Sequence, residues 1–299
     1  MAWRIGMMTA LIVAGLVGPV RAEISGPALV GQPQLYRAAF EDTLIDLAVR
    51  NRIGYVQLIA ANPDIDPWLP GAGTMLTLPT SHLLPRAEPN GIVINLPEMR
   101  LYYFSPEGEL LHTGAIGIGR EGMETPVGST KVTRKKAKPT WYPPDSIKAI
   151  KPYLPDVVPP GPDNPLGLYA LYLGWDHYLI HGTNTPVGVG RRTSGGCIRM
   201  YPADIEVLFN TVPIGTPVTV VDQPIKVGWI DNELYLEVHP TVAMIDAVEA
   251  NGRVEAQPAD PDLKMQVWFE AGLDEDQIDW AAAELAGRER RGVPVRISR

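Results

Sequence analysis

The chain has 299 residues, 45% of them apolar and 20% charged, which is enough for two or three domains with a sizeable core and excludes wholesale disorder. The formal net charge of −8 at pH 7 argues against a nucleic-acid partner, because phosphate binding needs a basic surface. Thirty prolines and twenty-nine glycines favour short strands and ordered loops over long helices.

Residues 1–22 have the pattern of a secretory signal peptide. Arg4 precedes an apolar run from Ile5 to Val17, and a cleavage site of the small-residue type follows at 20–22. The apolar run is too short for a comfortable membrane span, although an uncleaved anchor is the alternative interpretation. We therefore expect a protein that is exported to the periplasm and has no stable membrane span after the signal is removed.

Residues 35–80 are predicted to form a small α+β domain. Its expected elements are a strand at 35–38, a helix that begins after Asp42 and Thr43, a second helix at 55–61 and a strand at 75–78. Residues 81–90, which are polar and contain proline, are predicted to be a linker to the next domain.

The sequence of this small domain, FEDTLIDLAVRNRIGYVQLIAANPDIDPWLPGAGTMLTLP at 40–79, resembles a LysM module. LysM modules bind glycans that contain N-acetylglucosamine. The resemblance therefore implies that the domain binds the glycan strands of peptidoglycan through Asp42–Thr43 and Asn62–Pro63. The alternative is a packing domain without a ligand.

The segment 90–222 is predicted to be a mainly β domain, because its apolar residues alternate and many are β-branched. Gly117–Gly122 matches a dinucleotide-binding fingerprint by its letters, but Thr125–Gly128 follows where such a site needs a helix. No cofactor is therefore expected. The predicted elements are strands at 92–96, 99–104, 110–116, 125–133, 167–174, 176–181 and 216–221 and a short helix at 201–210.

Two segments of this β domain are unusual. The basic run at 134–138 is interpreted as a solvated edge strand protected by its lysines, and a binding site for the carboxylates of an acidic peptide is the alternative. Nine prolines between Pro139 and Pro165 exclude a helix or a central strand there. Because aromatic residues such as Trp141 lie among the prolines, we expect an ordered lid.

Residues 223–299 are interpreted as an accessory C-terminal α/β extension. A hairpin is predicted at 226–238, followed by helix-like runs at 241–249 and 275–290. No motif in this extension indicates a chemical role.

Cys197 is the only cysteine in the chain. In an oxidising compartment a structural cysteine normally has a disulfide partner. A single exported thiol is therefore an intermolecular bridge, a buried inert residue or a reactive group. The Ser-Gly-Gly sequence that precedes Cys197 argues against burial in a core.

His181 is a candidate base for this thiol, since a thiol attacks carbonyl groups as its thiolate. His181 lies 16 positions before Cys197, and the glycines between them allow the loop to turn sharply. The backbone N–H groups of Gly196 and Cys197 are candidate oxyanion donors. The positive charges expected to lower the thiol pKa and attract carboxylates are those of Arg191, Arg192 and Arg199.

Other interpretations of the same residues remain open at this point. His181 is also consistent with a hydrogen-bonded loop histidine, and Cys197 with a small buried thiol. A metal site made of His177, His181 and Cys197 is disfavoured because these residues lack the usual ligand spacing and a fourth partner.

Two motifs, IHGTN at 180–184 and SGGCIRM at 194–200, closely resemble the active-site signature of the L,D-transpeptidases with a YkuD-type catalytic domain. The resemblance extends to TPVGSTKV at 125–132 and to VVPPGPDNPLGLYALYL at 157–173, and it is strongest to the branch that attaches Braun's lipoprotein to peptidoglycan. It implies a catalytic domain at 90–222 that is a β-sandwich with short helices.

The resemblance also implies the roles of single residues. Cys197 matches the nucleophile and His181 the general acid and base. The residues expected to approach the thiol, the oxyanion and the substrate are Ser194, Gly195, Gly196, Arg199, Gly182 and Thr183. At Gly195 the family often has His, and this branch sometimes has Ser, so any catalytic help from that side chain is missing here.

The implied reaction is acyl transfer on the stem peptides of peptidoglycan. Cys197 attacks the carbonyl of the third stem residue, D-alanine leaves, and an amine then releases the thioester. The amine belongs to a second stem peptide, which gives a 3–3 cross-link, or to a lysine of a wall-anchored lipoprotein. Water as acceptor would make the protein a hydrolase, and a non-catalytic wall-binding protein is the alternative outside enzymes.

Overall fold

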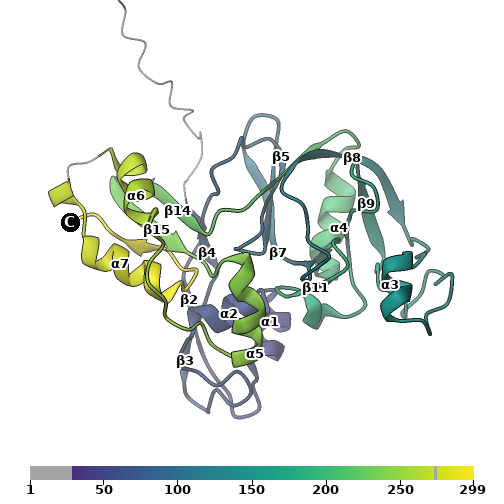
Figure 1. The fold of residues 1–299 in the computed structure, drawn as a ribbon, viewed down its shortest axis with the longest axis horizontal. Helices are drawn as coiled ribbons and strands as arrows, with labels where there is room; N and C mark the ends of the chain where they lie inside the picture. Colours follow the sequence, from purple (N-terminus) through teal and green to yellow (C-terminus); the bar gives the residue numbers. More distant parts are fainter. Residues whose placement is uncertain (1–28, 273–274) are drawn as a thin grey trace, which may run out of the picture.

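The computed structural model describes residues 29–272 and 275–299 and shows three parts along the chain (Figure 1). The predicted signal peptide at 1–22 lies outside the described residues. Among the residues that are described, none of the helices is long and apolar enough to cross a membrane.

The N-terminal unit has the predicted order of strand, helix, helix and strand. β2 (Gln34–Arg37) pairs antiparallel with β3 (Met75–Leu78), and α1 (Leu44–Asn51) and α2 (Tyr55–Ala61) lie between them in the chain. Thr43 caps α1, because its hydroxyl accepts a hydrogen bond from a first-turn backbone N–H at 3.2 Å. The secondary structure of this unit is thus confirmed.

The prediction that residues 81–90 form only a linker is wrong in part. Ser81–Leu83 forms β4, a buried strand that pairs antiparallel with β1 (Leu29–Gly31) and also contacts the C-terminal hairpin. A three-residue strand is too short to show the alternation that identifies strands in a sequence.

The central part is a nine-stranded mixed sheet that closes on itself. β6 pairs with both β5 and β7, which joins the two ends of the sheet around an apolar core. The mainly β domain is confirmed, although β11 and β12 were not predicted. In spatial order the strands are β11 (Arg192–Ser194), β7 (Leu110–Gly119), β12 (Ile198–Met200), β10 (Leu179–His181), β9 (Tyr169–Leu173), β8 (Gly128–Ala137), β13 (Pro217–Val221), β5 (Gly91–Asn95) and β6 (Arg100–Phe104).

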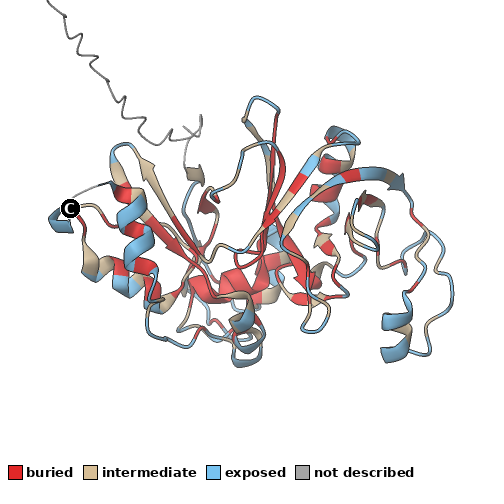
Figure 2. Cartoon of the chain, turned by 45° about the horizontal axis from the view of Figure 1, so that its top comes forward, coloured by how far each residue is buried: buried red, intermediate tan, exposed pale blue. Residues whose placement is uncertain are grey.

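The predicted helix of this domain is confirmed as α4 (Pro202–Thr211), which packs on β7 and β9. Its buried side chains include Ile205 and Leu208. In Figure 2 the buried residues follow the strands of the central part, whereas the region around α3 is largely exposed. The core therefore lies inside the closed sheet and beneath α4.

One prediction for this domain is confirmed and another needs correction. In the basic run at 134–138, the residues of β8 pair with β9 on one side only, since β13 pairs with the preceding residues 128–131, so the run is an exposed edge segment as predicted. The proline-rich segment contains a short helix, α3 (Asp145–Ile150), which was excluded at the sequence level. Pro144 precedes this helix and Pro152 follows it, so neither proline disrupts its single turn.

The C-terminal extension is a small α/β unit with its own core. The predicted hairpin is confirmed as β14 (Ile225–Ile230) and β15 (Glu233–Val238), and β16 (Val295–Arg296) adds a third strand. The helical segments are η2 (Val242–Met244), α5 (Ile245–Asn251), α6 (Leu263–Ala271), η3 (Glu275–Gln277) and α7 (Trp280–Glu289). α6 and α7 pack on the hairpin, whereas α5 joins the core shared by the other two parts.

A buried polar cluster joins the three parts. The ammonium of Lys226 lies 2.9 Å from Glu98 Oε2 and 3.1 Å from Glu237 Oε1, and it donates to the carbonyl of Leu83 at 2.7 Å. His82 is also buried, with its Nδ1 3.4 Å from Glu98 Oε1. His82, Glu98 and Glu237 are close enough to offer ligands to one metal ion, but the Lys226 ammonium already lies between the two carboxylates.

Candidate active site

Two neighbouring parallel strands bring the candidate base and nucleophile together. β10 pairs with β12 so that Ile180 faces Ile198 and His181 faces Arg199 in register. Cys197 is the residue immediately before β12, at the end of the loop that follows β11. The side chains of Ile180 and Ile198 point into the core. Because successive side chains alternate along a strand, His181 and Arg199 lie on the opposite face of the sheet.

The Ser-Gly-Gly-Cys loop is closed by its own hydrogen bonds. The Ser194 hydroxyl donates to the Cys197 carbonyl at 2.6 Å and accepts from the Gly196 N–H at 3.2 Å. The Thr125 hydroxyl donates to the Gly196 carbonyl at 2.8 Å. In this arrangement the Gly196 N–H must give up its hydrogen bond to the Ser194 hydroxyl before it can donate to an oxyanion.

Glycine is required at position 196 for two reasons. Gly196 has a φ of +105°, in the region that favours glycine. A Cβ atom there would also lie 2.9 Å from Cε1 of Tyr178. Gly195 differs, because its φ is not positive and its Cβ would meet only the flexible end of Ile147 in α3, at 2.9 Å.

A cavity of about 850 Å³ lies between this loop and the proline-rich lid. Trp141, Ile147 and Tyr153 of the lid line it. The predicted site residues in its lining are Cys197, His181, Ser194, Gly195 and Arg199. The structure therefore brings the predicted catalytic pair into one cavity. The proline-rich segment lies over this cavity, where a lid is expected.

Gly182 and Thr183 do not line this cavity but shape the turn after β10. The Gly182 N–H donates to the Tyr169 carbonyl at 3.1 Å, and the Thr183 hydroxyl accepts from the N–H of Thr185 at 2.9 Å. A Cβ atom on Gly167 would lie 2.8 Å from Thr183 N, so the turn packs tightly against the strand before it. Both predicted residues thus support His181 rather than face the cavity.

His181 is buried and is held in one orientation by a backbone carbonyl. Its Nδ1 lies 2.6 Å from the carbonyl oxygen of Gly182, so we assign the proton to Nδ1 in the neutral ring. Burial, assisted by the charge of Arg199, lowers the pKa of His181 to about 4. The imidazole is therefore neutral near pH 7 and able to accept a proton.

The Cys197 thiol donates to the His177 carbonyl at 3.3 Å. Burial raises its pKa, while the N–H of Leu179 and the charge of Arg199 act in the opposite direction. In residues 29–272 and 275–299 no hydrogen bond joins Sγ to His181. The pair is thus in its neutral resting form, and a thiolate forms only when a proton moves to the base.

The expected electrostatic help from three arginines is wrong for two of them. Arg191 pairs with Glu249 and Arg192 with Asp246, both in α5. Only Arg199 lies near enough to lower the pKa of the thiol. The sequence shows three adjacent positive charges but not the carboxylates that a distant segment brings to two of them.

Sequence analysis missed two cationic residues of the cavity, Arg120 and Lys151. Arg120 follows β7 and its N–H donates to the Ser194 carbonyl at 3.1 Å. It belongs to the Gly117–Gly122 segment that was set aside as a false nucleotide motif. Lys151 ends α3 in the lid, and no pattern in the sequence marks it.

A second cavity of about 660 Å³ also reaches Cys197. Its lining includes Arg134 and Lys136 from the basic run, with Trp175 and Tyr178. The guanidinium of Arg134 lies 3.6 Å from the ring centre of Tyr172, which holds it over that aromatic face. The alternative interpretation of the basic run, a site for carboxylates, is thus compatible with its position.

Comparison with known proteins decides the family. Residues 89–220 match the YkuD family, the L,D-transpeptidase catalytic domain. The chain is 39% identical over 281 residues to a protein of Escherichia coli K12 named probable L,D-transpeptidase YbiS, covering 91% of this chain and 90% of that one. The chain belongs to the L,D-transpeptidase family.

A second relative from E. coli agrees with this assignment. The transpeptidase is 39% identical over 283 residues to the E. coli K12 protein named probable L,D-transpeptidase ErfK/SrfK, covering 91% of this chain and 88% of that one. The solved catalytic domain of an L,D-transpeptidase from E. faecium aligns over 46% of this chain and all of that one, at 25% identity and a TM-score of 0.37. The family is that of a cysteine transpeptidase acting in the cell wall.

Proposed function

We propose that the transpeptidase uses Cys197 as its nucleophile and His181 as its general base and acid. The observation that carries this proposal is that the only thiol of the chain and a neutral, oriented imidazole line one cavity beneath the lid. His181 would accept the thiol proton as the sulfur attacks the carbonyl of the third stem residue. It would then protonate the D-alanine amine that leaves.

The charges around the thiol support an acidic peptide as the donor. Arg120, Lys151 and Arg199 line the cavity beneath the lid, and stem peptides carry carboxylates that such groups attract. Arg134 and Lys136 line the second cavity that reaches Cys197. We propose that donor and acceptor approach the thiol from these two cavities.

The acceptor is proposed to be an amine that replaces D-alanine on the thioester. A diamino acid of a second stem peptide would give a 3–3 cross-link, and a lysine of a wall-anchored lipoprotein would give a protein attached to the wall. The aromatic lid would keep water from the thioester and so favour transfer over hydrolysis. This chemistry requires an exported protein, in agreement with the signal predicted at 1–22.

We propose further that the N-terminal unit holds glycan strands of peptidoglycan, as its resemblance to a LysM module suggests. The Asp42 carboxylate is buried and accepts from the Tyr36 hydroxyl at 2.8 Å, and the Asn62 side chain accepts from the N–H of Thr77 at 2.8 Å. These two side chains are engaged inside the unit. Contact with glycan would therefore fall to accessible neighbours such as Trp68.

A single assay tests the proposed chemistry. Purified protein is incubated with a tetrapeptide muropeptide, with and without a lipoprotein acceptor, and the products are separated by mass. Cross-linked dimer or an adduct of the lipoprotein supports transfer, tripeptide alone supports hydrolysis, and no turnover supports a wall-binding role without catalysis.

Replacement of the nucleophile is the sharpest prediction for this site. Cys197→Ala is expected to abolish D-alanine release and to prevent covalent capture by a carbapenem, measured by intact mass, because no other thiol is present. Cys197→Ser serves as the isosteric control that preserves the loop. Turnover by the alanine variant at the parental rate would refute the assignment of Cys197.

A further inference from the structure

The strand that leads into the nucleophile loop is held by β7 on one side and by segments outside the catalytic domain on the other. β11 has only three residues, Arg192–Ser194, and its parallel pairing with β7 shifts register between Arg192 and Ser194. So short and irregular a strand has few backbone hydrogen bonds of its own. Its side chains therefore contribute to fixing its position.

Arg192 makes the side-chain contacts that join this strand to the C-terminal extension. Its guanidinium is buried, with Nη1 2.9 Å from Asp246 Oδ2 and 3.1 Å from the Val242 carbonyl. Its Nε donates to the carbonyl of Gly119, at the end of β7, at 3.3 Å. One planar group thus joins η2 and α5 of the C-terminal extension to the two strands β11 and β7.

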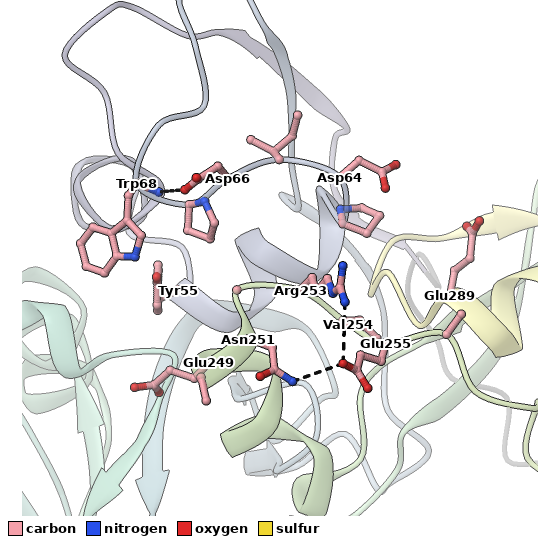
Figure 3. A pocket seen from close by; sticks show the side chains of 16 residues that line it. Tyr55, Asp64, Asp66, Trp68, Glu249, Asn251, Arg253, Val254, Glu255 and Glu289 are labelled. Atoms are coloured by element: carbon pink, nitrogen blue, oxygen red, sulfur yellow. Dashed lines mark hydrogen bonds and ion pairs between the residues drawn. The ribbon is translucent and has the colours of Figure 1, made fainter.

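The residues before Arg192 are held in the same way. Arg191 forms an ion pair with Glu249, one turn further along α5, and its guanidinium lies 5.6 Å from the ring centre of Tyr55 in α2. The carbonyl of Gly190 accepts from the N–H of Val56 at 3.1 Å. Figure 3 shows Tyr55 of α2 above Glu249 of α5, at the left end of the groove between the N-terminal unit and α5.

The contact between the backbones at Gly190 leaves no freedom at this point. Gly190 has a φ of +74°, and a Cβ atom there would lie 2.2 Å from the Cα of Gly54. Residues 190–192 therefore pass between α2 on one side and η2 and α5 on the other, and the guanidinium groups of Arg191 and Arg192 form their ion pairs with α5.

The line of contacts continues to the nucleophile. The Ser194 carbonyl, two residues after Arg192, accepts from the N–H of Arg120, and the Ser194 hydroxyl closes the loop on the Cys197 carbonyl. Arg192 itself does not line the cavity and touches no reacting atom. Any effect of Arg192 on catalysis must therefore pass through Ser194 and the loop.

We propose that η2 and α5 of the C-terminal extension form a positioning element for the nucleophile, and that Arg192 is the residue through which they act. The extension thereby has a function in catalysis although it carries no reacting group. This inference rests on the proposed role of Cys197. The physical reason is that attack on a carbonyl tolerates little displacement of the sulfur, so a small shift of the loop costs rate rather than binding.

The test compares four full-length variants. Arg192→Met removes the charge and all three hydrogen bonds, Arg192→Lys keeps the charge without the planar fork, and Asp246→Asn weakens one contact at a half-exposed site. Arg253→Met is the matched control, because Arg253 lies just after α5, is exposed and pairs with Glu255 only at 3.9 Å. Each variant is assayed for D-alanine release from a soluble tetrapeptide muropeptide.

We expect Arg192→Met to lower kcat by about 10- to 100-fold with KM changed by less than about 3-fold, because the loop moves while the binding cavity remains. Arg192→Lys should recover part of kcat, and Asp246→Asn should lower kcat by about 2- to 5-fold. A fifth variant combines Arg192→Met with Asp246→Asn. In it the effect of Asp246→Asn on kcat should disappear, since the partner of Asp246 is already absent. Arg253→Met should match the parent.

A second measurement separates this inference from the proposed reaction. Alkylation of Cys197 by iodoacetamide across pH needs no substrate turnover, so it reports on the thiol even if the muropeptide is not the substrate. A displaced loop should shift the pH profile of alkylation in Arg192→Met and Asp246→Asn. Unchanged kcat and alkylation profiles in both variants, with only a lower melting temperature, would show that the extension is merely structural. If Arg192→Met does not fold, Asp246→Asn and Arg192→Lys decide.

Discussion

At the scale of the residue, Gly195 is the position of the nucleophile loop that lies directly beneath the lid. Its backbone would accept a side chain, but the Cβ would lie 2.9 Å from Cδ1 of Ile147 in the lid. The glycine thus lets α3 pack directly over the nucleophile loop.

This contact predicts a coupled pair of substitutions. Gly195→Ala should lower kcat/KM by about 10-fold because Ile147 must move, and Ile147→Ala added to it should restore much of the loss, a coupling of about 1 kcal/mol. Muropeptide kinetics on the two single variants and the double variant measure this. Gly196→Ala is the contrast, because its positive φ and the Tyr178 ring leave no room for relief. Additive effects of Gly195→Ala and Ile147→Ala would contradict the proposed contact.

The sequence predicted most of the residues that line the candidate site but not their electrostatics. Cys197 and His181 could be found because a unique thiol, a histidine and small residues between them are visible in the letters. The raised pKa of Cys197 could not, since it results from burial by a lid whose position is a tertiary property. Nor could the pairing of Arg191 and Arg192 with carboxylates more than 50 residues away.

At the scale of the element, the lid is held together by one buried side chain. The Asn164 amide donates to the carbonyls of Pro139, Val158 and Pro159 at 2.9, 3.2 and 3.1 Å, and its oxygen accepts from the Leu166 N–H at 2.9 Å. Prolines cannot donate hydrogen bonds to these carbonyls, so an asparagine side chain takes the place of backbone pairing.

Asn164→Ala is therefore expected to loosen the lid. The loss removes the amide donor from the carbonyls of Pro139 and Pro159, whereas the Val158 carbonyl keeps the Trp141 N–H, and it should cost about 1–3 kcal/mol of stability. It should also raise the share of hydrolysed tripeptide relative to cross-linked product, because water reaches the thioester. Product ratios in the muropeptide assay check this, with Asn210→Ala, an exposed amide of α4 in the same domain, as control. An unchanged product ratio despite lower stability would show that the lid does not act by keeping water from the thioester.

Elements of ordinary length were predictable, and the shortest ones were not. α1, α2, α4 and the C-terminal hairpin follow from caps and apolar periodicity within the segment itself. β4, β11, β12 and β16 have two or three residues each, so their strand state depends on the neighbours that pair with them. α3 was excluded on its prolines, although these stand outside its single turn.

At the scale of the whole molecule, the three parts share one buried charge cluster. Lys226 of the C-terminal hairpin, His82 of β4, and Glu98 and Glu237 from the catalytic and C-terminal parts are all fully or almost fully buried. Burial raises the pKa of both carboxylates, but the Lys226 charge together with the neighbouring His82 and His239 more than offsets it, so both pKa values are lowered. Burial lowers the pKa of His82 to about 4. The association of the parts is thus linked to pH.

The sign of this linkage follows from the directions of the shifts. A histidine whose pKa falls from 6.5 to about 4 on folding stabilises the fold fully above pH 6.5 and loses that contribution as pH falls toward 4, which amounts to about 3 kcal/mol. Glu98 and Glu237, with lowered pKa values, lose their contribution only below their ordinary value of 4.5. The free energy of unfolding should therefore decline continuously from near pH 6.5 into the acid range.

Removal of the central cation tests this account of the assembly. Lys226→Met should lower the free energy of unfolding at pH 7.5 by about 3–5 kcal/mol, because two buried carboxylates then face each other without a counter-charge. The deficit should shrink near pH 5, where one carboxylate of the variant takes up a proton while the parent has itself lost stability. Denaturant unfolding at the two pH values measures this, with Lys264→Met, which breaks the exposed pair with Glu284, as control. A deficit of equal size at both pH values would mean that the lysine acts through packing of its side chain and not through the charges that hold the three parts together.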